Sequence, residues 1–552
     1  MIVAGPGTGK THTLVRRIFQ LIPNLKDNEK VLAITFTNKA ARQMQERLVS
    51  LSDDALKFVT VATFHSFCLQ VLRKYSRNTN LPEGFQVAAP GEIEALMKSH
   101  WNVPLKEVKN ILEEISRWKS FNPNQAKPVG LKDYNDLLRS RGLADFDDLI
   151  NSTLILLSNN EKAAGEIRRT YRFICVDEYQ DLNAIQNAFL KEMVKDGVRL
   201  TAIGDPNQAI YGFRGSDPRF FNQFDRDFPD ATITMLRENY RSTENILTAS
   251  SQVIASGKDR SSALEAIANI HQQGRLVVQE SATDKSEAEY VVSQIENLVG
   301  GTSMFSQDSG RVRNTAAAQF SFADIAVLYR LNAQKIVLKQ ALERSGIPFQ
   351  ISGDRSLSLT LEVIDVIRQY ARQSSQQEAF EILKSFAQSA EGRSFLETHE
   401  ELTLDWEGLL NFSRKTASLE DCFDQISLQK PDDHFDFNVE KVSLMTLHAA
   451  KGLEFPVVFV IGCEEGILPM NIAGLQSDIQ EERRLFYVGM TRAREYLYLT
   501  RAIKRPLFGQ ILNNPSSRFL ADIQEDLKAY EQIQQRTRRE TKKEDDSQLT
   551  LF

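Results

Sequence analysis

The start of the chain holds the feature that most constrains its fold. The run Ala4-Gly5-Pro6-Gly7-Thr8-Gly9-Lys10-Thr11 matches a phosphate-binding loop, with alanine at the first glycine position. The apolar pair Ile2-Val3 precedes the loop, and apolar residues from Leu14 to Ile22 recur on one helical face. A strand, a glycine-rich loop and a helix in this order predict a parallel α/β unit that binds phosphate at the helix N-terminus.

Apolar segments alternate with helical stretches along the rest of the chain, which predicts parallel sheets with helices on both faces. A first series comprises Val31–Thr35, Phe58–Ala62, Phe173–Val176, Leu200–Ile203 and Thr232–Leu236; a second comprises Ile325–Tyr329, Val442–Thr446, Val457–Ile461 and Tyr496–Thr500. We therefore expect an α/β fold with two sheet cores, each interrupted by a mainly helical insertion. The predicted divisions are 1–75 and 144–235 for the first core, 76–143 for its insertion, 236–345 and 438–521 for the second core, 346–437 for its insertion, and 522–552 for a disordered tail.

Length and composition narrow the class of protein. A chain of 552 residues is too long for one hydrophobic core, and its 42% hydrophobic and 25% charged residues are typical of globular proteins. No apolar run is long enough to span a membrane, so we expect no membrane association. The four cysteines include no CxxC pair, which favours reduced thiols in the cytoplasm. The net charge of −6 means that nucleic acid would have to bind in a local groove.

Two neighbouring carboxylates, Asp177 and Glu178, follow the apolar strand FICV. In an enzyme with a phosphate-binding loop, the aspartate helps hold Mg²⁺ and the glutamate polarises the water that attacks the γ-phosphate. Lys10 can reach the β- and γ-phosphates, and the Thr11 hydroxyl can hold Mg²⁺. These residues predict a site for ATP and Mg²⁺; the alternative for the two carboxylates is a solvated strand end.

The segment IGDPNQAIYGFRG offers groups for two ligands. The amide of Gln208 can sense a γ-phosphate. Phe213 and Arg214 offer a ring and a cation on the far side of the same loop, where a base can stack regardless of sequence. The alternative is that Tyr211 and Phe213 are aromatic residues of the core.

Arginines of the second series complete the predicted nucleotide chemistry. Arg241 lies in LRENYRS and Arg492 in EERRLFYVGMTRARE. Arginines from a second domain stabilise the transition state of phosphoryl transfer and make domain closure depend on ATP. For Arg483 and Arg484 we favour an ion-paired helix surface.

The motifs ITFTNKAA, ATFHSF and MTLHAAKGLEF each follow a strand. Loops at the carboxyl edge of a parallel sheet bind ligands. Their Thr, Asn, Ser and His side chains can contact a phosphodiester backbone without reading bases. The alternative for His65 and His448 is a core histidine with its hydrogen bonds satisfied.

Together these segments resemble the superfamily 1 helicases of the UvrD/Rep/PcrA type. The motifs AGPGTGKT, TFTNKAA, TFHSF, DFDDL, VDEYQD, GDPNQAIYGFRG, LRENYRS, TLHAAKGLEFPVV and EERRLFYVGMTRA occur in family order from residue 1 to about 502. The resemblance implies two RecA-like cores that grip ATP between them. It also implies 3′→5′ translocation on single-stranded DNA, with unwinding of the duplex ahead, in DNA repair or replication.

The resemblance also implies roles for single residues. Within the loop Ala4-Gly5-Pro6-Gly7-Thr8-Gly9-Lys10-Thr11, Lys10 and Thr11 would bind phosphate and Mg²⁺. Asp177 would complete the metal site and Glu178 would act as the catalytic base. The nucleotide would meet Gln208, Arg241 and Arg492 at its γ-phosphate, Tyr240 at its adenine and Glu454 at its ribose. The implied DNA contacts are Phe36, Thr37, Asn38, His65, Phe213, Arg214, Thr446 and His448.

Two features depart from the family pattern. Family members carry a segment before the phosphate-binding loop, with a glutamine that reads the adenine edge. That segment is absent here, so we expect a chain truncated at its N-terminus, with a weaker first strand and less selectivity for adenine. The second insertion, near residues 346–437, is short for the family, in which its orientation regulates unwinding.

Three alternatives to a helicase stay open: a translocase that strips proteins from DNA, the motor subunit of a helicase–nuclease, and a non-catalytic DNA-binding scaffold. The polar tail ends in Gln548-Leu549-Thr550-Leu551-Phe552. This peptide resembles the motif with which many bacterial replication and repair proteins bind the sliding clamp. Gln548 would bond at a pocket rim, and Leu549, Leu551 and Phe552 would enter apolar pockets; the alternative is a chance apolar terminus or a locally paired strand.

Overall fold

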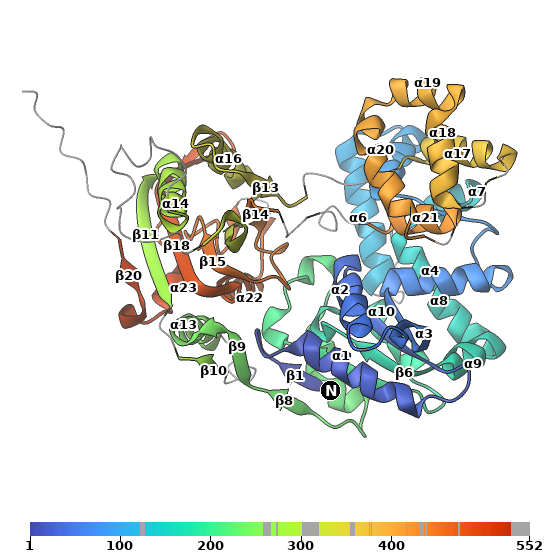
Figure 1. The fold of residues 1–552 in the computed structure, drawn as a ribbon, viewed down its shortest axis with the longest axis horizontal. Helices are drawn as coiled ribbons and strands as arrows, with labels where there is room; N and C mark the ends of the chain where they lie inside the picture. Colours follow the sequence, from blue (N-terminus) through green and yellow to red (C-terminus); the bar gives the residue numbers. More distant parts are fainter. Residues whose placement is uncertain are drawn as a thin grey trace, which may run out of the picture.

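The computed structural model describes residues 1–121, 127–257, 266–271, 274–300, 320–353, 359–374, 376, 378–416, 418–429, 435, 439–472 and 475–531. Two parallel sheets, each packed between helices, form two cores, and a helical subdomain extends from each of them (Figure 1). The expected α/β fold with two sheet cores is confirmed, and each predicted strand segment overlaps a strand of the structure.

The first sheet is parallel throughout, in the order β3-β2-β6-β7-β1-β8. Its strands are β1 (Ile2–Ala4), β2 (Lys30–Thr35), β3 (Val59–Thr63), β6 (Tyr171–Val176), β7 (Arg199–Gly204) and β8 (Thr234–Leu236). Val31 and Ala33 of β2 pack with one group of core residues, and Leu32 and Ile34 pack with another, because successive side chains point to opposite faces. The helices of this core are α1 (Lys10–Leu21), α2 (Asn38–Val49), α3 (Ala55–Phe58), α4 (Phe64–Lys74), α8 (Phe146–Asn159), α9 (Glu161–Thr170), α10 (Ala184–Met193), α11 (Arg219–Asn222) and α12 (Phe224–Asp227).

β1 is only three residues long, yet it has a partner on each side. Ile2 is aligned with Ile203 of β7 and with Thr234 of β8, and Ala4 is fully buried. This double pairing fixes the direction in which the chain enters the phosphate-binding loop.

The second sheet is also parallel along its main path, in the order β13-β14-β12-β15-β18-β11-β20, while β19 pairs antiparallel with β18. Its strands are β11 (Arg275–Thr283), β12 (Ile325–Tyr329), β13 (Phe349–Ile351), β14 (Val442–Thr446), β15 (Phe455–Val460), β18 (Ala493–Leu507), β19 (Gln510–Leu512) and β20 (Ala529–Tyr530). The helices of this core are α13 (Glu244–Ala255), α14 (Asp284–Leu298), α16 (Lys335–Arg344), α22 (Ile479–Met490) and α23 (Arg518–Ala521). Short strand pairs lie outside the two sheets: β9 (Glu238–Thr243) with β10 (Ile267–Ile270), β16 (Asn471–Ile472) with β17 (Leu475–Gln476), and β4 (Gln86–Val87) with β5 (Leu143–Ala144).

Two predicted limits of the second core need correction. β13 continues this sheet beyond residue 345, because Phe349 is aligned with Val442 of β14. β20 lies beyond residue 521 and adds a strand to β11, where Glu531 accepts a hydrogen bond from Tyr290 at 2.8 Å. β13 has three residues and β20 has two, so both strands leave little signal in the sequence. The rest of the tail, including Gln548–Phe552, lies outside the described residues.

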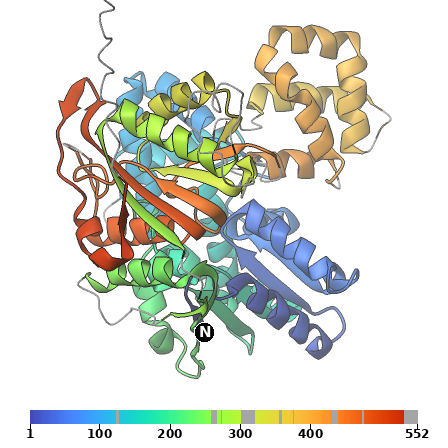
Figure 2. The same cartoon turned by 60° about the vertical axis from the view of Figure 1, so that its left-hand side comes forward.

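Both expected insertions are helical. The first holds α5 (Pro90–Trp101), α6 (Leu105–Phe121) and α7 (Leu131–Ser140); the second holds α17 (Leu361–Gln373), α18 (Ala379–Gln388), α19 (Ala390–Thr398), α20 (Glu400–Ser413) and α21 (Leu419–Ser427). The second group packs around its own apolar residues and projects from the cores as a separate unit (Figure 2). It contacts the first core through Asp424, which pairs with Arg73 of α4 at 2.6 Å.

Two predictions from composition are also tested. The four cysteines are buried and unpaired. Within the described part of the chain, none of the helices combines the length and apolar character that crossing a bilayer would require.

Candidate active site

The phosphate-binding loop can turn tightly because two of its glycines adopt left-handed backbone angles. φ is 68° at Gly7 and 80° at Gly9, values that strongly favour glycine. The Thr8 hydroxyl donates to the carbonyl oxygen of Gly5 at 2.8 Å. Helix α1 begins at Lys10, so the first N–H groups of the helix border the loop, an arrangement that binds anions.

The motif LRENYRS lies directly on this loop. The Asn239 side chain donates to the carbonyl oxygen of Pro6 at 2.7 Å, and the Tyr240 N–H donates to that of Gly7 at 2.9 Å. A Cβ atom at Gly7 would lie 2.6 Å from the Cβ of Arg241, so only glycine leaves room for this approach. Arg241 is therefore held beside the loop that carries Lys10.

A cleft of about 1220 Å³ opens at this junction. Both cores contribute to its lining, which includes the predicted residues Gly7, Gly9, Lys10, Thr11, Glu178, Gln208, Tyr240, Arg241, Glu454 and Arg492. Asp177 is buried next to Glu178, and the Glu178 N–H donates to the Asp177 carboxylate at 2.9 Å. The structure therefore brings the predicted nucleotide residues together in one cleft.

The two carboxylates lie in different electrostatic environments. Burial raises the pKa of Asp177, and the charge of Glu178 adds to this effect. Burial acts in the same direction on Glu178, but the charges of Lys10 and Lys451 outweigh it and hold the pKa of Glu178 below its usual value. The Gln180 amide also donates to Glu178 at 2.5 Å. Glu178 is thus ionised at neutral pH and can accept a proton.

Two side chains at or next to the cleft carry oxygen atoms suited to Mg²⁺. Thr11 offers a hydroxyl and Asp177 a carboxylate, which are the hard ligands that this ion prefers. A bound cation would also favour the ionised form of the buried Asp177. The residues present therefore fit the metal that ATP brings.

The second core supplies positive charge to the cleft. Arg492 is fully buried, and its guanidinium donates to the carbonyl oxygens of Val488 and Leu453, each at 2.9 Å. Burial and the neighbouring Arg241 lower the pKa of Arg492 to about 9. Arg241 pairs with Glu454 at 2.6 Å, and Glu454 also pairs with Arg494. An anion in the cleft would relieve the repulsion between the two arginines.

Gln208 is connected to Glu178 by a chain of hydrogen bonds. Its amide donates to the Asp205 carboxylate at 2.7 Å. The N–H of Asp205 donates to Gln180 at 3.0 Å, and Gln180 bonds to Glu178. The γ-phosphate sensor and the catalytic base expected from the sequence thus belong to one buried network.

Three of the predicted DNA contacts lie close together: Phe213, Arg214 and His448. The ring of Phe213 is 64% exposed and meets the His448 ring edge-on, with 5.3 Å between ring centroids. The Arg214 guanidinium lies over the Phe213 ring at 5.5 Å. Tyr211 instead packs on the second core. Core packing thus explains Tyr211, whereas Phe213 is available for stacking.

The other predicted DNA contacts lie at strand ends and have local roles. Thr37 accepts a hydrogen bond from Ala40 and caps α2, and Thr446 accepts one from Ala449. Phe36 packs edge-on against Phe64. These roles leave the predicted DNA contacts untested.

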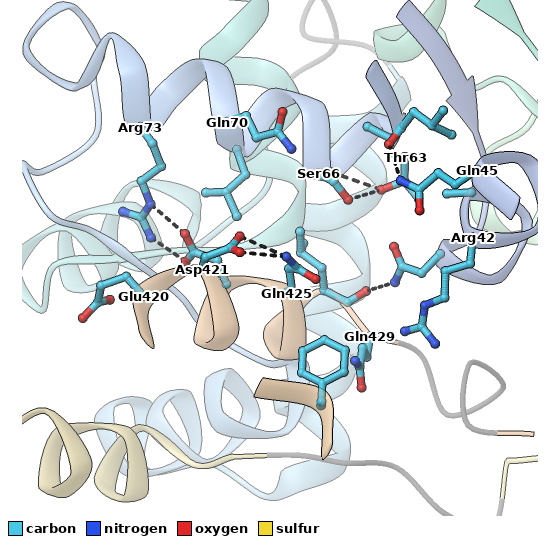
Figure 3. Close-up of a pocket in the computed structure, with 18 of the residues that line it drawn as sticks. Arg42, Gln45, Thr63, Ser66, Gln70, Arg73, Glu420, Asp421, Gln425 and Gln429 are labelled. Atoms are coloured by element: carbon cyan, nitrogen blue, oxygen red, sulfur yellow. Dashed lines mark hydrogen bonds and ion pairs between the residues drawn. The ribbon is translucent and has the colours of Figure 1, made fainter. Parts of the chain in front are cut away.

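A second, polar groove of about 520 Å³ separates the first core from α21. Figure 3 shows Thr63, Ser66 and Arg73 on one side of it, facing the acidic side chains of α21. Asn38 reaches across and donates to the carbonyl oxygen of Leu428 at 3.0 Å. The inserted helices thus cover part of the surface predicted to contact DNA.

Comparisons with known proteins agree with this geometry. Residues 1–229 match the UvrD/REP helicase N-terminal domain, and residues 234–403 and 368–504 match the UvrD-like helicase C-terminal domain. The chain belongs to the UvrD/REP helicase family. It is 30% identical to the ATP-dependent DNA helicase PcrA of Staphylococcus aureus strain Mu50 and 31% identical to that of Staphylococcus epidermidis, in each case over 96% of this chain and 84% of the relative. The solved C-terminal domain of a possible DNA helicase from Lactobacillus plantarum covers 53% of this chain at 15% identity, with a TM-score of 0.24.

Three charged residues of the second core were missed or misjudged from the sequence. Arg484 donates to the carbonyl oxygen of Ala209 in the first core at 2.7 Å, a contact between the cores that the expected helix surface did not include. Arg483 is ion-paired with Asp522 as expected, but it is buried. Lys451 joins the two cores through Asp181. Only the position of Lys451 in MTLHAAKGLEF, next to the predicted DNA contacts, could have drawn attention to it.

Proposed function

We propose that this chain couples ATP hydrolysis to 3′→5′ movement along single-stranded DNA and unwinds duplex DNA, in repair or replication in the cytoplasm. The observation that carries the proposal is the cleft itself, in which Lys10 and Glu178 of the first core meet Arg241 and Arg492 of the second. Hydrolysis in such a cleft depends on the relative position of the cores, as a motor requires. The polarity follows from the UvrD/Rep/PcrA resemblance.

The chemistry assigned to the cleft follows from these side chains. Glu178 accepts the proton of the water that attacks the γ-phosphorus, and Lys10, Arg241 and Arg492 stabilise the charge that develops on the phosphate oxygens. Mg²⁺, held by Thr11 and Asp177, would neutralise charge on the β- and γ-phosphates. Tyr240 is 62% exposed at the cleft, which suits a ring that stacks on adenine.

A hairpin of the second core favours unwinding over translocation alone. At the sheet edge where β14 ends at Thr446, β18 extends beyond its last pair with β15. The chain then turns back and forms β19, which pairs antiparallel with the end of β18. The tip residue Phe508 is 64% exposed and has a φ of 52°, a strained angle for this residue type. An aromatic ring held out at such a tip can stack against the last base pair of a duplex.

Strand displacement tests the proposal directly. The wild-type chain, with ATP and Mg²⁺, should unwind a duplex with a 3′ single-stranded tail and leave a 5′-tailed duplex intact. ATP hydrolysis is measured in parallel with and without single-stranded DNA. DNA-stimulated hydrolysis without displacement would identify a translocase. No stimulation at all would identify the scaffold, and unwinding that needs a nuclease chain would identify the motor subunit.

We also propose that Gln548–Phe552 binds the bacterial sliding clamp. The support is the sequence alone: a glutamine and three apolar residues end a strongly polar tail. A short peptide that orders on binding gives modest affinity, which simultaneous binding of DNA would raise through effective concentration.

A further inference from the structure

The segment Gln208–Gly212 follows β7 of the first core, but its apolar residues pack on the second core. Ile210 is fully buried in a cluster with Leu447 and Leu485, which belong to the second core. Tyr211 packs against the same cluster. The segment is thus anchored across the boundary between the cores.

Three charged side chains of the second core also bind the backbone of this segment. Lys451 donates to the carbonyl oxygen of Gln208 at 2.6 Å. Arg484 donates to that of Ala209 at 2.7 Å, and Glu481 accepts from the N–H of Gly212 at 2.9 Å. We call Lys451, Glu481 and Arg484 the clasp residues. Hydrogen bonds with a charged partner are the strong ones, so these bonds tie the segment firmly to the second core.

The two ends of the segment reach different ligands of the proposed function. At one end the Gln208 side chain belongs to the buried network that leads through Asp205 to Glu178. At the other end Phe213 meets His448 at the proposed DNA surface. Among the described residues that line the nucleotide cleft, none is a clasp residue, so Glu481 and Arg484 would act on ATP through Gln208, whereas the charge of Lys451 also acts on Glu178.

We propose that the clasp residues position Gln208 and carry the effect of bound single-stranded DNA to the ATPase site. When DNA binds at Phe213 and His448, the second core moves, and the clasp moves the backbone of Gln208 with it. The amide then reaches the position in which it assists hydrolysis. This inference rests on the proposed function, since it requires ATPase activity that DNA stimulates.

The central test compares two neighbouring arginines in the full chain. Arg484→Met removes a bond between the cores. The matched control Arg483→Met removes a buried guanidinium whose bonds, to the Val253 carbonyl oxygen at 2.6 Å and to Asp522, stay within the second core. We expect Arg484→Met to lower turnover at saturating single-stranded DNA by about tenfold, which corresponds to about 1.4 kcal/mol. DNA-free turnover, KM for ATP and DNA affinity should stay within about twofold, well below that step.

Arg483→Met should lower the thermal unfolding temperature and keep the ratio of DNA-stimulated to DNA-free turnover. Equal stimulation in wild type and Arg484→Met would overturn the inference, as would an equal loss in both variants. If wild type itself shows no stimulation, the proposed function fails first, so the two failures are distinguishable.

Variants of Glu481 provide a second test, in which no arginine is replaced. Glu481→Gln keeps a carbonyl oxygen that can accept from Gly212 and should retain stimulation, whereas Glu481→Ala should lose it. Gly212→Ala places a Cβ against the Glu481 carboxylate and should resemble Glu481→Ala. Stimulation lost in Glu481→Gln and kept in Glu481→Ala would contradict the clasp. Lys451 is left out of this comparison because its charge also acts on Glu178.

Discussion

Replacing Arg492 by methionine should remove catalysis and leave the fold nearly as stable as before. The structure buries this guanidinium completely, beside the like charge of Arg241. In a phosphoryl-transfer enzyme an arginine supplied by a second domain contributes about a thousandfold or more to turnover. We therefore expect kcat to fall by about that factor.

Two opposing contributions set the effect of Arg492 on the stability of the fold. Burial and Arg241 lower the pKa of Arg492 far below the usual value of an arginine, to about 9. Each tenfold change in a protonation equilibrium is worth about 1.4 kcal/mol, so at pH 7 the charge costs the folded state several kcal/mol. The bonds to Val488 and Leu453 return about 3–6 kcal/mol, at 1.5–3 kcal/mol for each bond from a charged donor. These contributions nearly cancel, and methionine fills much of the same volume.

The assay combines turnover with thermal unfolding, with and without a non-hydrolysable ATP analogue. The unfolding temperature of Arg492→Met should lie within about 5 °C of wild type. The analogue should raise it less in the variant, because its phosphates no longer relieve the repulsion between the two arginines. A variant that unfolds far below wild type, or one that turns over ATP normally, would refute the reasoning.

Four further predictions concern other parts of the chain. Lys10→Ala should abolish DNA-stimulated ATP hydrolysis, measured by phosphate release, with no change in thermal unfolding. Phe508→Ala should slow displacement of a 3′-tailed duplex by about tenfold, if the lost stacking is worth 1–3 kcal/mol, and leave DNA-stimulated hydrolysis unchanged. Burial and the charges of Arg330 and Arg214 lower the pKa of His448 to about 3. His448 is therefore neutral from pH 6 to 8, and the affinity for single-stranded DNA should vary with pH alike in wild type and His448→Gln; a step near pH 6.5 in wild type alone would contradict this. Deleting Gln548–Phe552 should abolish binding to the sliding clamp and preserve ATPase activity, so clamp binding that survives the deletion would reject that assignment.

The sequence predicted the sheet cores and the nucleotide cleft because both depend on local patterns. Buried parallel strands such as β2 and β12 appear as apolar runs, and the run at Val31–Ile34 is fully buried. The phosphate-binding loop depends on glycines at positions of positive φ, such as Gly7 and Gly9. Once the strands are predicted, the positions of Asp177 and Thr446 at strand ends are predicted as well.

Interactions between the cores could not be predicted in this way. Arg483 and Arg484 are neighbours on α22, and neither sequence position nor charge distinguishes them. Because successive residues of a helix point about 100° apart, Arg483 turns into the second core while Arg484 reaches the first. Which of the two joins the cores depends on how the domains dock, and that is decided by residues far apart in the sequence.

The sequence also could not show to which core the segment Gln208–Gly212 is bound. By sequence, Gln208–Gly212 is a loop of the first core, and its motif suggests that it contacts ATP and DNA in turn. In the structure its backbone is bound to Lys451, Arg484 and Glu481, and Ile210 is buried in the second core. A segment tied to the ATPase network at one end and to the second core along its length changes position whenever the cores move relative to each other. If the proposed function is correct, coupling between DNA and ATP runs through this segment, because the boundary between the cores passes through it.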